Sequence, residues 1–202
     1  MKINTYSSYE EMCKHVVEDI RYAINFNMFS EYFTLGLATG STPLGIYKYM
    51  RDNHPYSYEH FMEENLFVYK QFRHSYFPTN DRYDDMIQNN GGIDIQILGI
   101  GTNGHIAFNE PGSSRDSLTR KVELTENTRK DNSRFFDSID DVPTHAYTMG
   151  IESIMRAKQI YLLASGKHKK EILEKACHGE ITSDVPASFL QEHNNVEVLY
   201  CD

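Results

Sequence analysis

Residues 95–114 read IQILGIGTNGHIAFNEPGSS, and this stretch decides the fold. Its first residues form a short apolar run, which is typical of a buried strand in a parallel sheet. The glycines that follow predict a turn at the end of that strand, where open α/β sheets place their functional groups. A non-helical loop can bring His105 and Glu110, five residues apart, into one crevice. The alternative is a glycine-rich loop in which His105 is merely hydrogen-bonded, because short motifs often match by chance.

Strands and helices alternate along the rest of the chain. Apolar runs predict strands at residues 2–5, 33–38, 96–100, 121–124, 159–164 and 196–200. Helical spacing and capping signals predict helices from Ser8 through Ile24, from the Pro43 region to about Met50, and at residues 81–88, 125–135, 151–156, 167–177 and 186–191. Phe61, Leu66 and Phe67 are compatible with one further helix. The order predicts a three-layer α/β fold, Rossmann-like, with a mostly parallel sheet and helices on both faces. We expect a single domain over residues 1–202.

Composition limits the function. The chain has 202 residues, a formal net charge of −9 and a hydrophobic fraction of 40%, which are typical of a soluble globular protein. The negative charge argues against binding to nucleic acids or to an anionic membrane surface, since both require basic patches. An anionic small molecule would need a local cluster of cations and backbone N–H groups.

The cysteines and the N-terminus indicate a cytoplasmic protein. Cys13, Cys177 and Cys201 are scattered and lack CxxC spacing, which predicts reduced thiols and no zinc site of the usual pattern. The opening residues lack the apolar core of a signal peptide, and no apolar run is long enough to span a bilayer.

A second motif, LATGSTPL at residues 37–44, predicts an anion site. A strand ends, Gly40 permits a tight turn, and a helix begins near Pro43. The N–H groups at the start of that helix, with the Ser41 and Thr42 hydroxyls, can bind an anion. The alternative is that Thr39 or Ser41 simply caps the helix.

Two cations are candidates to complete this site. Arg134 lies in NSRFF at the end of a predicted helix, and Lys169 lies in the first turn of another. A lysine at a helix N-terminus opposes the helix dipole, so local stability does not explain it. The alternative is that Lys167, Lys169 and Lys170 form a solvated face.

The quoted runs, together with HPYSYEHFM (54–62), TMGIESIMRAK (148–158) and PASFLQEH (186–193), resemble the glucosamine-6-phosphate deaminase (isomerase) family. The related 6-phosphogluconolactonases share the Gly-His loop, but the continuation Phe108–Pro111 is similar to the deaminases. The resemblance extends from the first strand to the last.

The resemblance implies roles for the motif residues. His105 would open the pyranose ring by moving a proton from the anomeric hydroxyl to the ring oxygen, and Glu110 would orient it. Asn103 stands where the family often has an aspartate, so similar geometry with weaker electrostatic support for the imidazolium is expected. The 6-phosphate would be bound by Thr39, Gly40, Ser41, Thr42, Arg134 and Lys169. No metal or other cofactor is implied.

The chain also departs from the family. Its members normally carry an Asp-Glu-Tyr strand before the HPxSY segment, and that Asp moves the proton between C1 and C2. Here family segments are missing near residues 50–54 and 70–90, and Asp52 has no matching context. Either residues of the molecule are omitted from this sequence, or the chain is a shortened paralogue without the base. Losing a central strand is costly, which favours the omission.

A further departure concerns regulation. Arg120 matches one cation of the allosteric members, but Val122 stands where a second is expected. We therefore expect no activation by an amino-sugar phosphate.

The resemblance implies an enzyme of amino-sugar metabolism, and specifically of N-acetylglucosamine catabolism. It would convert glucosamine 6-phosphate and water to fructose 6-phosphate and ammonia. The alternatives are a galactosamine-6-phosphate isomerase, a catalytically silent sugar-phosphate-binding paralogue and, less favoured, a lactonase. Both a monomer and a homo-oligomer are compatible with the sequence.

Overall fold

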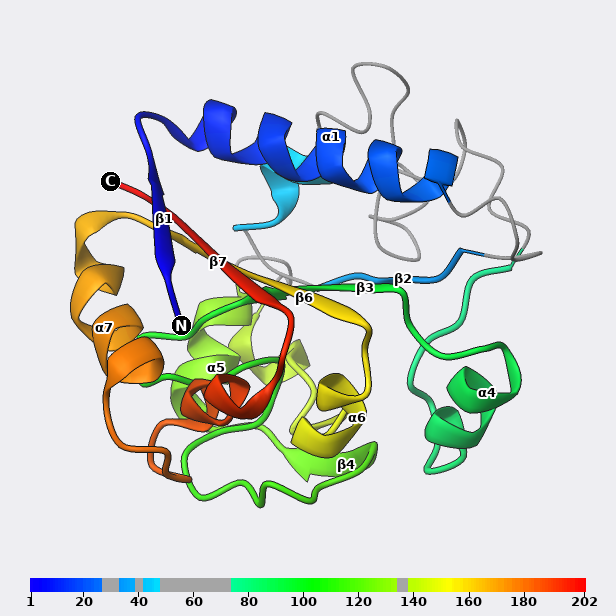
Figure 1. Ribbon diagram of the computed structural model, residues 1–202. Coiled ribbons are helices and arrows are strands. Elements are labelled where there is room, and N and C mark those ends of the chain that lie inside the picture. Colours follow the sequence, from blue (N-terminus) through cyan, green and yellow to red (C-terminus); the bar gives the residue numbers. More distant parts are fainter. Residues whose placement is uncertain (27–32, 39–41, 48–73, 134–137) are drawn as a thin grey trace.

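The computed structural model describes residues 1–26, 33–38, 42–47, 74–133 and 138–202. Its centre is a five-stranded parallel sheet in the order β1-β7-β6-β3-β2 (Figure 1). The strands are β1 (Ile3–Tyr6), β2 (Leu35–Gly36), β3 (Ile95–Gly99), β6 (Gln159–Ser165) and β7 (Val196–Cys201). Because the pairings are parallel, the carboxyl ends of the strands lie along one edge of the sheet.

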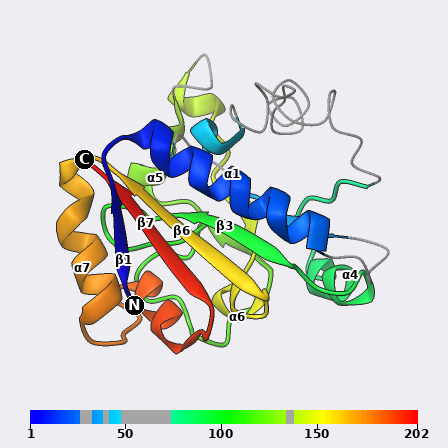
Figure 2. The same cartoon turned by 45° about the horizontal axis from the view of Figure 1, so that its top comes forward.

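Helix α1 (Tyr9–Phe26) covers one face of this sheet (Figure 2). The helix start is fixed by Ser8, whose hydroxyl oxygen accepts a hydrogen bond from the Glu11 N–H at 3.1 Å. The Glu11 carboxylate in turn accepts from the backbone N–H and hydroxyl of Ser7. Apolar positions at helical spacing on α1 pack on alternate strand positions. The buried residues of this layer are Met12, Cys13, Val16, Val17, Ile20, Ile46, Tyr47, Ile95, Ile97, Tyr161, Leu163, Leu199 and Cys201.

In the described part of the chain, four helical elements pack on the opposite face. They are α4 (Tyr83–Asn89), α6 (Ile151–Met155), α7 (Lys170–His178) and the 3-10 helix η5 (Pro186–Glu192). Their apolar side chains meet the other set of alternating strand residues. Buried members of this layer include Ile87, Leu98, Ile100, Ile154, Ile160, Leu162, Ala164, Ile172, Leu173, Ala176, Leu190 and Val198. The sheet is therefore the middle of three layers, and the predicted α/β class is confirmed.

A small antiparallel pair lies beside the main sheet. It consists of β4 (Arg120–Glu123) and β5 (His145–Thr148). Helix α5 (Glu126–Asn132) and the 3-10 helix η3 (Ile139–Asp141) lie between these strands in sequence. The hydroxyl of Thr148 accepts a hydrogen bond from the Phe108 N–H at 3.1 Å, which ties β5 to the loop after β3.

The structure refines several predicted elements. The predicted strand 33–38 is reduced to β2, and the predicted helix 167–177 begins with one 3-10 turn, η4 (Lys167–Lys169). The chain is helical at 44–47. The helix predicted around Phe61, Leu66 and Phe67 lies outside the described residues, as do residues 50–54 and the start of 70–90. The pairing of β4 with β5 was not predicted, because the sequence pattern at 145–149 predicts no partner strand.

The longest helix in the described part of the chain is α1, with 18 residues. Within that part, no helix combines the length and the apolar character that crossing a bilayer requires.

Candidate active site

The loop after β3 is a tight turn that reverses the chain. The Gly104 N–H donates to the Gly101 carbonyl at 3.0 Å, and the Gly101 N–H donates to the His105 carbonyl at 2.8 Å. Gly104 has a φ of +85°, a conformation that favours glycine. A side chain on Gly104 would also collide with Val185. The turn therefore requires glycine for both backbone and packing reasons.

Gly101 serves a different purpose. A Cβ added to Gly101 would overlap the imidazole ring of His105. The ring thus lies directly on the backbone of the turn, because no side chain separates them. The glycine-rich loop therefore positions the His105 ring and also reverses the chain.

Three polar side chains of this loop form a hydrogen-bonded chain. The Asn103 Nδ2 group donates to Glu110 Oε2 at 2.7 Å. The Asn103 Oδ1 atom lies 2.8 Å from His105 Nδ1 and accepts from the His105 backbone N–H at 3.2 Å. The distance from His105 Nδ1 to Glu110 Oε2 is 3.5 Å. Asn103 therefore bridges the carboxylate and the ring.

This order of donors and acceptors fixes the tautomer of the histidine. A carboxylate only accepts hydrogen bonds, so it takes the amide NH₂ of Asn103. The amide oxygen then faces His105 Nδ1, which must carry the hydrogen in a neutral ring. The lone pair is left on Nε2, where it can accept a proton.

Glu110 is held by donors on its other oxygen as well. The Thr128 hydroxyl donates to Glu110 Oε1 at 2.7 Å, and the Thr125 hydroxyl donates to the Thr128 oxygen at 2.9 Å. Burial by itself raises the pKa of Glu110, but the hydrogen bonds from Thr128 and Asn103 and the charge of His105 outweigh it. The net effect lowers the pKa, so the carboxylate is ionised at neutral pH.

The structure shows why α5 begins beside Glu110. Thr125 is the N-cap of α5, and its hydroxyl oxygen accepts from the Thr128 N–H at 3.2 Å. The same helical turn orients the Thr128 hydroxyl, which is buried against the carboxylate. Sequence reasoning missed both threonines as site residues, although the pattern Thr-x-x-Thr at a helix start gives a signal for the turn.

Buried hydrogen bonds hold the end of the loop in place. Asn109 is fully buried, and its Nδ2 group donates to the carbonyls of Ile106 and Met149. The Arg120 guanidinium donates to Asn109 Oδ1 at 2.9 Å, and burial lowers the pKa of Arg120. Arg120 thus supports the loop that carries Glu110.

Two of the predicted phosphate contacts lie at the same strand end. A Cβ added to Gly99, the last residue of β3, would lie 4.0 Å from the Cβ of Thr42. Lys169 is half-buried and its Nζ donates to the Ile100 carbonyl at 2.8 Å, whereas Lys167 is exposed. Lys169 is therefore directed to the carboxyl end of β3. The other predicted contacts, Thr39, Gly40, Ser41 and Arg134, lie outside the described residues.

Comparisons with known proteins agree with the predicted fold and family. A family model described as glucosamine-6-phosphate isomerases/6-phosphogluconolactonase matches residues 56–199. The chain is 48% identical to a glucosamine-6-phosphate deaminase of Lactobacillus johnsonii, with 83% of this chain and 82% of that protein aligned. It is 45% identical to a glucosamine-6-phosphate deaminase of Listeria monocytogenes, with 84% and 85% aligned. The alignment with the Lactobacillus johnsonii protein is 198 residues long. The aligned 83% of this 202-residue chain contains fewer residues than that, so part of the relative has no counterpart in this sequence.

Solved structures give the same result. A monomeric glucosamine-6-phosphate deaminase superposes with a TM-score of 0.85 at 36% identity, covering 100% of this chain and 97% of that one. A 6-phosphogluconolactonase from Trypanosoma brucei superposes with a TM-score of 0.71 at 16% identity, covering 99% and 95%. The second likeness is one of fold alone.

Proposed function

Because this chain belongs to the family of glucosamine-6-phosphate isomerases and 6-phosphogluconolactonases, we propose that it converts glucosamine 6-phosphate and water to fructose 6-phosphate and ammonia. The relatives that are 45–48% identical are named as glucosamine-6-phosphate deaminases. The 6-phosphogluconolactonase structures from Trypanosoma brucei and Trypanosoma cruzi are 16% and 18% identical to this chain. This difference supports the deaminase over the lactonase.

The observation that carries the proposal is the chain Glu110–Asn103–His105. It holds a proton on His105 Nδ1, which puts the basic lone pair of the neutral ring on Nε2. In the proposed ring opening, Nε2 takes the proton of the anomeric hydroxyl and returns it to the ring oxygen. The imidazolium formed between these transfers is stabilised by the ionised Glu110, whose Oε2 lies 3.5 Å from Nδ1.

The 6-phosphate is assigned to the strand end beside Thr42 and Lys169. Both residues flank the end of β3, and the His105 loop starts from the same strand end. A phosphate bound there gains a charge-assisted hydrogen bond from the Lys169 ammonium. We include Thr39, Gly40, Ser41 and Arg134 in this site on the resemblance of their motifs.

The second half of the reaction requires a base that moves a proton between C2 and C1. The family's Asp-Glu-Tyr strand is missing from this sequence, and residues 48–73 lie outside the described part. We propose that the chain forms one sugar-phosphate domain. Family segments near residues 50–54 and 70–90 would then be part of the molecule but omitted from this sequence. The excess of aligned length over the residues this chain contributes agrees with family segments being missing from this sequence.

We also propose that the reaction belongs to N-acetylglucosamine catabolism in the cytoplasm. Cys13, Cys177 and Cys201 are buried and unpaired, which is typical of a reducing compartment.

The proposal is tested by ammonia release from purified protein supplied with glucosamine 6-phosphate. His105→Gln is expected to lower kcat/KM by about 10²–10⁴-fold, since it removes a general acid–base group. The matched control is His178→Gln, which alters an exposed histidine on α7 and should leave turnover unchanged. Full activity in His105→Gln would rule out the proposed ring-opening role.

Parallel assays separate the alternatives. Faster ammonia release from galactosamine 6-phosphate would favour the galacto isomer as substrate. Thermal stabilisation by both sugars without ammonia release would favour a binding paralogue. Hydrolysis of 6-phosphogluconolactone without deamination would favour a lactonase.

A further inference from the structure

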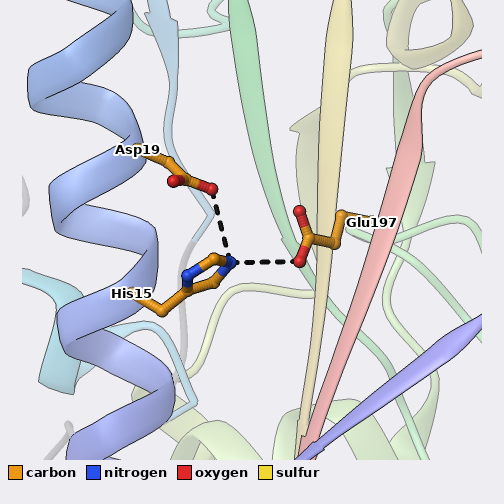
Figure 3. Close-up of side chains that lie close together, drawn as sticks. All are labelled: His15, Asp19 and Glu197. Atoms are coloured by element: carbon orange, nitrogen blue, oxygen red, sulfur yellow. Dashed lines mark hydrogen bonds and ion pairs between the residues drawn. The ribbon is translucent and has the colours of Figure 1, made fainter.

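A second cluster of titratable side chains lies away from the loop after β3, between α1 and the sheet. His15 and Asp19 are one turn apart on α1, and Glu197 is on β7. Glu197 alternates with Leu199 and Cys201, whose side chains face α1. The three side chains point toward one another from the helix and the strand (Figure 3).

The histidine faces both carboxylates with one ring nitrogen. His15 Nε2 lies 3.3 Å from Asp19 Oδ2 and 3.1 Å from Glu197 Oε1. All three atoms lie within 4.8 Å of one another. A single N–H cannot make two good hydrogen bonds, so sharing it between two acceptors lengthens both.

An ordinary pair on another helix provides a reference. His178 and Glu174 on α7 have the same i, i+4 spacing, and His178 Nδ1 lies 2.8 Å from the single carboxylate oxygen. The longer contacts of His15 are therefore not a property of histidine–carboxylate pairs in this protein. They reflect convergence of two carboxylates on one nitrogen.

The spacing suits ligands of one metal ion. Zinc binds imidazole nitrogen and carboxylate oxygen at about 2.0–2.2 Å, which places neighbouring ligand atoms about 3.0–3.5 Å apart. The two contacts of His15 Nε2 fall within this interval. Rotation of the half-exposed carboxylates brings their oxygens toward the same ion.

The charges around the cluster also favour a cation. Within the described part of the chain, no lysine or arginine is ion-paired with Asp19 or Glu197. Burial and the charges of Glu197 and Asp19 raise the pKa of Tyr6 to about 12. Burial and Asp19 likewise raise the pKa of Tyr161. Two carboxylates beside one imidazole leave a local excess of negative charge.

Neutral donors already orient the carboxylate oxygens. The Tyr161 hydroxyl donates to Asp19 Oδ2 at 2.8 Å, and Asn4 Nδ2 donates to Glu197 Oε1 at 2.8 Å. Such outer hydrogen bonds fix ligand geometry in metal sites without adding charge. The side chains of His15, Asp19 and Glu197 keep exposed fractions of 36%, 37% and 24%, so solvent reaches them.

We propose that His15 Nε2, Asp19 and Glu197 bind one divalent cation of the zinc class, with water completing the coordination. One imidazole with two carboxylates suits Zn²⁺ better than Mg²⁺, which prefers an all-oxygen octahedron. The ion would link α1 to β7 and stabilise the packing of that layer. This site is independent of the proposed function, because none of its ligands belongs to the His105 loop.

The test uses the intact chain after treatment with a chelator. Titration with Zn²⁺ is expected to show one site per chain and to raise the Tm, because a ligand that binds only the folded state stabilises it. Co²⁺ should give a visible absorption band from the same site. Asp19→Asn and Glu197→Gln should each weaken Zn²⁺ binding at least 10-fold and remove the Tm shift. Both variants keep the shape of the side chain.

The matched control is Glu18→Gln, which neutralises an exposed carboxylate next to Asp19. It should bind Zn²⁺ like the unaltered chain. Each variant is first shown by circular dichroism to be folded without metal. Unchanged Zn²⁺ affinity in the Asp19→Asn, Glu197→Gln double variant would overturn the proposal, as would a Tm rise of equal size with Mg²⁺. Absence of binding at millimolar Zn²⁺ would identify the cluster as a plain ion-pair network.

Discussion

At the scale of single residues, the hydroxyl of Thr128 decides how readily Glu110 takes up a proton. It is the largest of the contributions that lower the pKa of this carboxylate, against the effect of burial. Because the folded pKa is lowered, ionised Glu110 stabilises the protein above its ordinary pKa. That contribution is lost as the pH falls through the lowered value.

Thr128→Val is therefore expected to raise the pKa of Glu110 and to move the acid limb of kcat/KM to higher pH. Losing a hydrogen bond to a charged group should also lower the free energy of unfolding at pH 7 by about 1.5–3 kcal/mol. The pH profile and urea unfolding measure the two effects.

Thr119→Val is the matched control. Thr119 is also buried, but its hydroxyl has no hydrogen-bond partner among the described residues. Its replacement should leave the pH profile unchanged and should not lower stability. Equal behaviour of the two variants would contradict the role given to Thr128.

The sequence indicated the residues of this site but not all of their partners. His105, Glu110 and Asn103 are close in sequence, so a loop motif was enough to group them, and their roles stay a prediction. Thr128 is 18 residues from Glu110, and only the fold brings them together. Likewise, His15 and Glu197 are 182 residues apart, and no local pattern predicts their contact.

At the scale of elements, the turn after β3 uses glycine for two separable reasons. Gly101 leaves room for the His105 ring, whereas Gly112, later in the same loop, has a φ of +91° and open space around its Cα. Alanine at Gly101 therefore tests packing against the ring, and alanine at Gly112 tests backbone strain.

Gly101→Ala is expected to displace the ring and lower kcat about 10²-fold, since a shift near 1 Å has an effect of that size. Gly112→Ala should lower the free energy of unfolding by about 1–2 kcal/mol, because a left-handed conformation is costly for a residue with a Cβ, and should leave kcat unchanged. Steady-state kinetics and thermal unfolding distinguish the two patterns. A kcat loss confined to Gly112→Ala would contradict this division of roles.

Most helices and strands followed from local periodicity, because each buries one face against the sheet. Local periodicity did not predict the features that depend on which strand a segment pairs with. β2 is shorter than its apolar run, and the β4–β5 pair depends on contacts between segments more than twenty residues apart. The order β1-β7-β6-β3-β2 is likewise a product of the assembled chain.

At the scale of the whole molecule, the proposed phosphate contact joins two distant segments. Lys169 precedes α7, yet its ammonium group lies at the end of β3, 69 residues away in sequence. Its neighbour Lys167 lies in the same 3-10 turn and is exposed to solvent. The two lysines therefore provide a matched pair.

Lys169→Met is expected to weaken binding of glucosamine 6-phosphate about 10–100-fold, because it removes a charged hydrogen bond to the phosphate. Lys167→Met should bind normally. Ligand-induced thermal stabilisation measures both, whether or not the chain turns the sugar over. Equal affinities for the two variants would remove Lys169 from the phosphate site.

The sheet order has a consequence for synthesis on the ribosome. β1 pairs with β7, and β7 lies between β1 and β6. Among the described strands, β1 is synthesised first, but its paired neighbour β7 is synthesised last. Until the residues from Val196 onward emerge, β1 keeps unpaired N–H and C=O groups. The nascent protein therefore presents an open strand edge until Val196–Cys201 has been synthesised, and the sheet closes only after that step.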